Sequence, residues 1–233
     1  MYAYPIMLQV VNAVTMHSKA LSRATDLTEL HGHLIRVLNQ MHAQIVDQPR
    51  GKAATNEPEV VFLLAGYSWR LNDFRTWQFL FDKQKRQFFA RRATFHHKRT
   101  KGTKYFAFVG DYVSEAVGQL YQLLHRRARL TTGGLDMEPF EVLVEFIRSG
   151  RYPSIGGPPQ VVKIYRHSNF LPHSIYWPSR AQGTLSLFGR ALLPYERLKY
   201  LALDPDTLEV VDPDEQRATG RSASTARRGD AAP

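Results

Sequence analysis

Cysteine is absent from the 233 residues of this chain. The sequence therefore excludes a disulfide framework, a thiolate nucleophile and a zinc site with cysteine ligands. No apolar run reaches the roughly 18 residues of a membrane-spanning helix, and the N-terminal MYAYPIMLQVV lacks the basic start and the small-residue cleavage site of a secretory signal. We predict a cytoplasmic protein with no membrane partner.

Several catalytic and cofactor motifs are also missing. The chain has no HExxH zinc motif and no Gly-X-Ser-X-Gly nucleophile elbow. His31 and His33 would point about 200° apart on a helix, and His96 and His97 stand among cations that repel a metal ion. Residues 156–158, Gly-Gly-Pro, lack the Lys and Ser/Thr of a phosphate loop, so a rigid turn is expected. We predict neither a metal nor a cofactor.

What the chain does contain is enough apolar surface for a core. Apolar residues make up 43% and aromatic residues 12% of the sequence, which is typical of a globular protein. The length favours one domain, which we place at residues 1–215. Residues 216–233 are rich in Ser, Ala, Gly and Arg and have no aromatic residue, so we expect a disordered basic tail.

Hydrophobic spacing predicts the order of the elements. Helical periodicity predicts the helices, and the alternation or continuity of apolar residues predicts the strands. Further short strands are expected between residues 174 and 211. We expect helices at 5–21, 27–46, 112–128 and 138–149, and strands at 60–69, 74–81, 87–95, 103–109 and 160–167. The fold class is α/β, in the layered α+β sense, with mainly antiparallel sheets packed by pairs of helices.

Local signals indicate how some elements begin and end. Asp26 and Glu29 have the spacing of a capping box before the helix at 27–46. Gly66, inside a strand, indicates close approach of the backbone to another group, and Gly150 should end the helix at 138–149. Asp111 could be a carboxylate in a cleft, but the more economical interpretation is the N-cap of the helix at 112–128.

Three passages resemble a known family. VVFLLAGYSW, followed by a hairpin, resembles the central strand pair of proteasome-type N-terminal-nucleophile hydrolases. KYFAFVGDYVSEAVGQLYQLL resembles the strand, glycine turn and helix of that family, and EPFEVLVEFIRSG with IGGPPQVVKIY resembles the next helix and strand. The resemblance runs in order from Tyr4 to Val211 and implies an N-terminal-nucleophile hydrolase-like fold, in which two antiparallel sheets lie between helical layers.

The chain departs from this family at its start. The family's processed chains begin with a Thr, Ser or Cys nucleophile on a first strand, whereas here a helix is predicted almost at once, after Met1 and Tyr2. We therefore expect the fold to be incomplete at the N-terminus, and the catalytic residues, if the protein is an enzyme, stay unknown from the sequence. Gly102-Thr103 and Gly183-Thr184 offer the type of bond that such enzymes cut, but two ordinary strand starts are the preferred interpretation.

A basic segment covers residues 83–104. It holds nine Lys or Arg residues and no Asp or Glu, interleaved with phenylalanines, a mixture expected where phosphates meet cations and bases stack on rings. On a hairpin the same pattern could instead bury the rings and leave a solvated charged face. The candidate nucleic-acid-binding residues are Arg91, Arg92, Lys98, Arg99 and Lys101.

Three hypotheses about function remain open from the sequence. The first is a noncatalytic or truncated proteasome-like subunit that associates with itself or with a partner subunit. The second is a nucleic-acid-binding module that uses the basic hairpin. The third is a threonine- or serine-type peptidase or amidase whose nucleophile strand lies upstream of Met1. The sequence identifies no substrate.

Overall fold

The structure, a computed structural model, describes residues 3–16, 25–44, 58–93, 106–130, 134–166 and 169–213. These residues group into two compact units. Unit 1 comprises residues 1–135 and 164–169, and unit 2 comprises residues 136–163 and 170–233. The described part is mixed α/β, with four α-helices, which confirms the coarse fold class.

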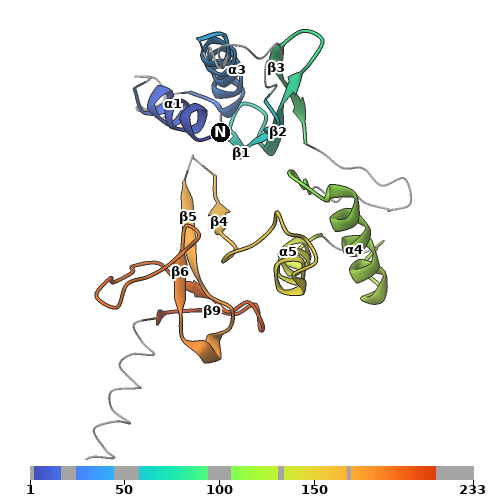
Figure 1. Ribbon diagram of the computed structural model, residues 1–233, viewed down its shortest axis with the longest axis vertical. Helices are drawn as coiled ribbons and strands as arrows, with labels where there is room; N and C mark the ends of the chain where they lie inside the picture. The colour runs from blue at the N-terminus through green and yellow to red at the C-terminus, as the bar shows by residue number, and fades with distance from the viewer. Residues whose placement is uncertain are drawn as a thin grey trace, which may run out of the picture. The chain divides into compact units, whose positions relative to one another are not determined.

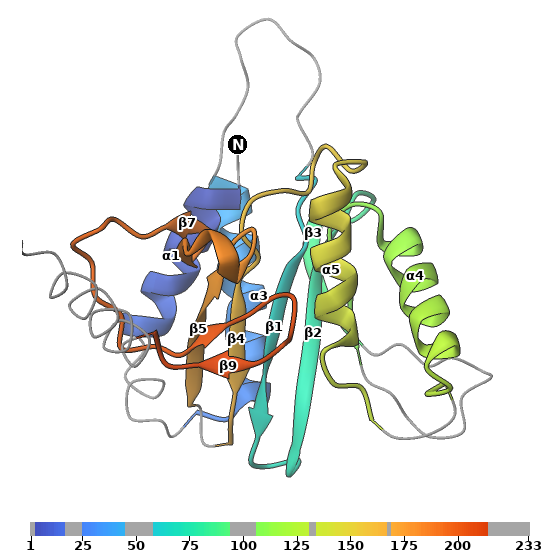
Figure 2. The same ribbon diagram turned by 90° about the horizontal axis from the view of Figure 1, so that it is seen from below.

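Unit 1 is built on a three-stranded antiparallel sheet in the order β1-β2-β3 (Figures 1 and 2). A long hairpin forms most of this sheet, because β2 and β3 are joined by a tight turn at residues 83–86. The helices of the unit are α1, α3 and α4. The elements span α1 (Ala3–Met16), α3 (Leu27–Gln44), β1 (Phe62–Ser68), β2 (Asp73–Asp82), β3 (Gln87–Arg92) and α4 (Val113–Arg126).

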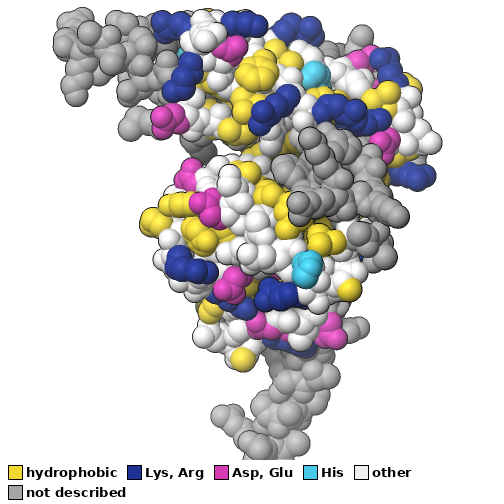
Figure 3. All heavy atoms as spheres, turned by 90° about the vertical axis from the view of Figure 1, so that its right-hand side faces the viewer, with side chains coloured by type: hydrophobic (Ala, Val, Ile, Leu, Met, Phe, Trp, Pro, Cys, Tyr) yellow, Lys and Arg dark blue, Asp and Glu magenta, His cyan; other side chains and the backbone are white. Residues whose placement is uncertain are grey.

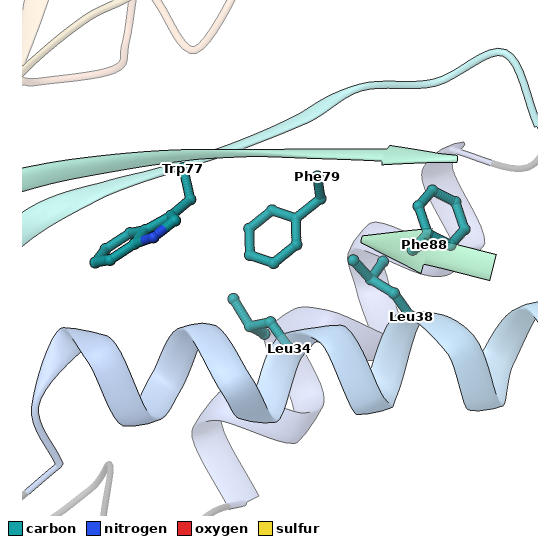
Figure 4. Packing of buried hydrophobic residues seen from close by; sticks show 5 residues of the cluster. All are labelled: Leu34, Leu38, Trp77, Phe79 and Phe88. Carbon is teal, nitrogen blue, oxygen red and sulfur yellow. The ribbon is translucent and has the colours of Figure 1, made fainter. Parts of the chain in front are cut away.

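Helix α3 covers one face of this sheet. Its apolar stripe turns Leu34 and Leu38 toward Trp77 and Phe79 of β2 and Phe88 of β3 (Figure 4). Val10 and Val14 of α1 pack against the same cluster. All five cluster residues are at most 8% exposed. Alternate residues of β2 and β3 therefore face α3, and the intervening residues face the opposite side of the sheet.

Asp26 fixes the start of α3. Its Oδ2 accepts hydrogen bonds from the backbone N–H and the hydroxyl of Thr28, at 2.9 and 2.7 Å. The same carboxylate accepts from the Ser68 hydroxyl at 2.9 Å and from the Arg70 N–H at 3.3 Å. Burial alone would raise the pKa of Asp26, but these hydrogen bonds outweigh it and lower the pKa to about 2. The predicted N-cap is confirmed, and Glu29 forms an ion pair with Arg70 at 2.6 Å.

Unit 2 contains a six-stranded mixed sheet. The strands follow the order β7-β6-β5-β8-β9, and β4 also pairs with β5. The pairs β5–β6, β6–β7 and β8–β9 are antiparallel, and β5 pairs with β8 in parallel. Its elements are α5 (Glu138–Ser149), β4 (Val161–Ile164), β5 (Phe170–Tyr176), the 3-10 helix η1 (Arg180–Gln182), β6 (Leu185–Leu187), β7 (Arg190–Ala191), β8 (Ala202–Leu203) and β9 (Val210–Val211).

Most predicted elements are confirmed in their described parts. The helix predicted at 138–149 matches α5, which ends at Gly150 with a positive φ of 63°. The prediction for Gly66 is also confirmed, because a Cβ there would lie 2.9 Å from Leu27 Cδ1. The strand predicted at 160–167 is shorter than expected. It ends at Ile164, and the N–H of the next residue, Tyr165, donates a hydrogen bond to the Asn169 carbonyl.

Two predictions are wrong. The strand expected at 103–109 is not present in its described part, because residues 106–109 join no sheet and the Phe108 carbonyl accepts a side-chain hydrogen bond from Gln78. Asp111 does not cap α4: the N-cap residue is Tyr112, with φ 56° and no side-chain cap. Positive φ at both Gly110 and Tyr112 turns the chain so that the helix starts one residue later than a cap at Asp111 requires.

Some expectations stay predictions. The chain groups into two units, so a single domain at 1–215 is neither confirmed nor contradicted. The tail at 216–233 lies outside the described residues. None of the described helices is long and apolar enough to cross a membrane.

Replacing Asp26 with Ala should lower the free energy of unfolding by about 2–4 kcal/mol, because α3 loses its cap and the Ser68 hydroxyl is left buried without its acceptor. Denaturant unfolding followed by circular dichroism measures the loss. Asp82→Ala is the matched control. Its carboxylate also accepts two backbone N–H groups, but in an exposed turn, so about 1 kcal/mol or less is expected. Equal losses in the two variants would contradict this account of Asp26.

Acid should destabilise the fold through His31. This ring stacks on Trp77 at 4.9 Å, and its buried Nε2 has no hydrogen-bond partner. Burial lowers the pKa of His31 from 6.5, so the unfolded chain binds the proton more tightly than the folded one. The stabilisation is therefore complete above about pH 6.5 and is lost as the pH falls below that value.

The His31→Phe variant removes this titration and keeps an aromatic ring against Trp77. Its melting temperature should fall less than that of the wild type between about pH 7 and about pH 5. His125→Gln, at an exposed position of α4, is the control variant. The same pH dependence in all three proteins would show that His31 does not contribute.

Candidate binding pocket beside the basic hairpin

The basic hairpin divides its aromatic residues between the two faces of the sheet. Phe88 is 1% exposed and belongs to the core beneath α3, whereas the next residue, Phe89, is 40% exposed. The turn is closed by Asp82, whose Oδ1 accepts the N–H groups of Gln84 and Lys85. The interpretation that the phenylalanine rings of this hairpin are buried in the core is therefore correct for Phe88 and wrong for Phe89.

Arg91 is held in place by a chain of hydrogen bonds. In the sheet register Arg91 lies opposite Gln78. Its Nε donates to Gln78 Oε1 at 3.0 Å, and Gln78 Nε2 donates to the Phe108 carbonyl at 3.4 Å. Gln78 thus connects β3 with the segment that precedes α4. Because Nε is used, the two terminal nitrogens of the guanidinium keep their donors for other partners.

A pocket of about 530 Å³ lies between these groups. Gln78 and Arg91 supply polar side chains from the face of the sheet opposite α3, and Arg92 is also among the lining residues. Its apolar lining comes mainly from Val61, Leu80, Phe106, Phe108, Val113 and Val117. The rings of Phe106 and Phe108 meet edge to face at 5.7 Å. All lining residues belong to unit 1, so the pocket forms within one compact body.

The electrostatics of the pocket favour a negative ligand. None of its thirteen lining residues is acidic. Within the described ranges neither Arg91 nor Arg92 forms an ion pair. Both side chains are exposed, and Figure 3 shows Lys and Arg side chains next to hydrophobic ones on one face of the molecule. An arginine that has no carboxylate partner and lies beside an apolar pocket favours the binding of an amphipathic anion.

The structure brings together two of the five residues predicted for nucleic-acid binding. Arg91 and Arg92 both line the pocket. Lys98, Arg99 and Lys101 lie outside the described residues. Sequence reasoning missed Gln78 and Phe108. The only signal for Gln78 was an amide side chain between two aromatic residues of a strand, and nothing indicated that it would contact Phe108, thirty positions later.

The other predicted sites do not combine into a reaction centre in the described residues. Asp111, the candidate carboxylate in a cleft, is exposed. Thr184 continues the strand pairing, because its carbonyl accepts the Trp177 N–H at 2.9 Å, while Thr103 lies outside the described part. In that part no group of three or more His, Asp or Glu side chains could hold a metal ion.

Comparisons with models of known protein families, with curated proteins and with solved structures find no match. The resemblance to proteasome-type hydrolases therefore rests on the sequence motifs alone.

Proposed function

We propose that this chain is a noncatalytic, N-terminal-nucleophile hydrolase-like subunit that associates with a second copy of itself. The observation that carries the proposal is the edge of the sheet in unit 1. Within the described residues β1 pairs only with β2, so one row of its backbone N–H and C=O groups has no strand partner. Such a row is a template for pairing with another chain.

The strand β1 itself carries none of the residues that oppose pairing, although Arg166 lies over the ring of Tyr67 near its end. Proteins protect sheet edges with charged side chains, prolines or bulges. The seven residues of β1, Phe62–Ser68, contain neither a charge nor a proline. The opposite edge, β3, carries Arg91 and Arg92. On β1, Leu63 is 45% exposed, which gives an approaching strand apolar surface as well as backbone partners.

A second copy of β1 is the natural occupant of this edge. Antiparallel pairing of two identical strands about a twofold axis closes after one step, as in most homodimers, and joins two three-stranded sheets into one of six strands. The proposal also accounts for the noncatalytic part of the assignment. Ser68, the buried serine at the end of β1, donates to Asp26 and accepts the Leu71 N–H, so its hydroxyl serves the fold.

The Leu63→Lys variant should convert an associated protein into a monomer, because a lysine on an edge strand opposes pairing. Size-exclusion chromatography with light scattering at micromolar concentration measures the mass. Leu193→Lys is the matched control: this leucine is 47% exposed and lies outside any strand, so its variant should stay associated. A monomeric wild-type protein, or a Leu63→Lys variant that still associates while correctly folded by circular dichroism, would refute the proposal.

A second candidate function is the binding of single-stranded nucleic acid. The observation in its favour is the pair of exposed arginines, Arg91 and Arg92, which have no ion pairs in the described part; Arg91 shares its face of β3 with the exposed Phe89. Phosphates bound to such cations release counterions, so the affinity should fall as the salt concentration rises. Lys98, Arg99 and Lys101 would extend the same basic surface along the sequence.

The Arg91→Gln, Arg92→Gln double variant should reduce the slope of log affinity against log salt concentration by about 1 to 2, because two phosphate contacts are lost. Fluorescence anisotropy with a labelled oligothymidylate measures binding. Lys85→Gln, on the same hairpin, and deletion of residues 216–233 are the controls and should change the slope less. Failure of the intact chain to bind at about 50 mM salt, or loss of binding on tail deletion alone, would rule out this hairpin function.

A further inference from the structure

We propose that the pocket beside the basic hairpin binds a carboxylate that carries an apolar or aromatic body. The inference goes beyond self-association and uses different residues: the association edge is at β1, and the charged side of the pocket is at β3. It does not depend on nucleic-acid binding either, although it shares Arg91 and Arg92 with that candidate.

The guanidinium of Arg91 is oriented so that it can bind a carboxylate. Its Nε donates a hydrogen bond to Gln78, and Gln78 in turn donates to the Phe108 carbonyl. These two hydrogen bonds orient the plane of the guanidinium. The two terminal nitrogens make no hydrogen bond to a described residue. Two parallel N–H groups on a planar fork match the two oxygens of a carboxylate. Arg92 also lines the pocket, but it is the register partner of Trp77, so its side chain leaves β3 on the face toward α3 and Arg91 is the residue that would bind the carboxylate.

The apolar walls decide against a small inorganic anion. Most lining residues are apolar, including Leu80, Phe106, Phe108 and Val117. A phosphate or sulfate ion would engage the arginines and leave these walls unused. The volume of about 530 Å³ lies in the range of pockets that bury small organic ligands. A ligand that binds the arginine and also fills the apolar part of the pocket has one carboxylate and an aromatic or branched aliphatic body.

This chemistry has two natural sources. One is a free carboxylic acid, and the other is the C-terminus of a peptide that ends in an apolar residue, which presents the same carboxylate beside a similar side chain. The pocket residues recognise what the two share. The experiment therefore uses a probe of each source.

Isothermal titration of the full-length chain with 3-phenylpropanoate is the primary test, with 3-phenylpropanamide as the neutral, isosteric control probe. The acid should bind at least about tenfold more tightly than the amide. Arg91→Gln should weaken binding of the acid by at least about tenfold, and Arg91→Lys should also weaken it, because lysine keeps the charge but lacks the fork. Lys85→Gln, an equal change of charge on the same hairpin, should leave the affinity unchanged.

Two further measurements complete the test. Leu80→Asp places a carboxylate in the wall and should abolish binding, with circular dichroism to verify folding. An acetylated tripeptide ending in phenylalanine, compared with its C-terminal amide, tests the second source: binding of the free acid form alone assigns a peptide end, and binding of 3-phenylpropanoate alone assigns a small acid. Either result supports the pocket.

The proposal is overturned if the acid and the amide bind equally, if Arg91→Gln binds as the wild type does, or if neither acid binds at millimolar concentration. Competition by inorganic phosphate as effective as that by 3-phenylpropanoate would also overturn it, because the apolar walls would then contribute nothing. These outcomes are independent of the oligomeric state, which the Leu63→Lys variant reports separately.

Discussion

The packing of α3 against the sheet of unit 1 is the interaction on which the candidate sites depend. It is fixed at one end by the Asp26 carboxylate, which caps the helix and also holds Ser68 and Arg70 at the end of β1. It is fixed along its length by Leu34 and Leu38 against the aromatic residues of β2 and β3. Because a strand alternates its side chains, burying Trp77 and Phe79 on one face places Gln78 on the other.

That alternation determines the chemistry of the face of the sheet opposite α3, against which residues 106–110 and α4 form the pocket. Leu63 of β1, Gln78 of β2 and Arg91 of β3 are register partners across the three strands. The row changes from apolar at one edge to cationic at the other, with an amide between them that can donate and accept at once. Gln78 does both, because its Oε1 accepts a hydrogen bond from Arg91 and its Nε2 donates one to the Phe108 carbonyl. A hydrophobic residue at this position would leave Arg91 without its orienting partner.

Periodicity in the sequence was sufficient to predict the elements whose side chains reach a core. The stripe from Leu27 to Leu38 predicted α3, and the alternation at Trp77, Gln78 and Phe79 predicted β2 and its two faces. It failed at Phe106 to Val109, where apolar residues line a pocket and do not enter a sheet. Local propensity favours a strand there, and only tertiary contacts decide otherwise.

The sites were harder to predict than the fold for a related reason. Arg91 and Arg92 were recognisable by their charge, but Gln78 and Phe108 matter only through contacts between distant segments, which a single sequence does not display. Asp111 shows the same limit at shorter range, since a good N-cap residue is displaced from its role by the positive φ of its neighbours Gly110 and Tyr112. The two-residue strands β7 and β8 carry too few side chains to produce a period at all.

Association at β1 and ligand binding at the pocket are compatible because the backbone edge used for association is on β1, whereas Arg91, which would bind the carboxylate, is on β3; Val61, directly before β1, is the lining residue nearest in sequence to the association edge. Neighbouring strands lie about 4.8 Å apart, so the free backbone of β1 and the backbone of β3 are separated by about 10 Å. A second copy added to β1 extends the sheet away from β3 and leaves Arg91 as it was. The charges on β3 serve a further purpose in this arrangement, because they oppose pairing at that edge and so direct a second copy to β1. Arg91 would therefore define where the ligand binds, and both arginines would limit how the protein assembles.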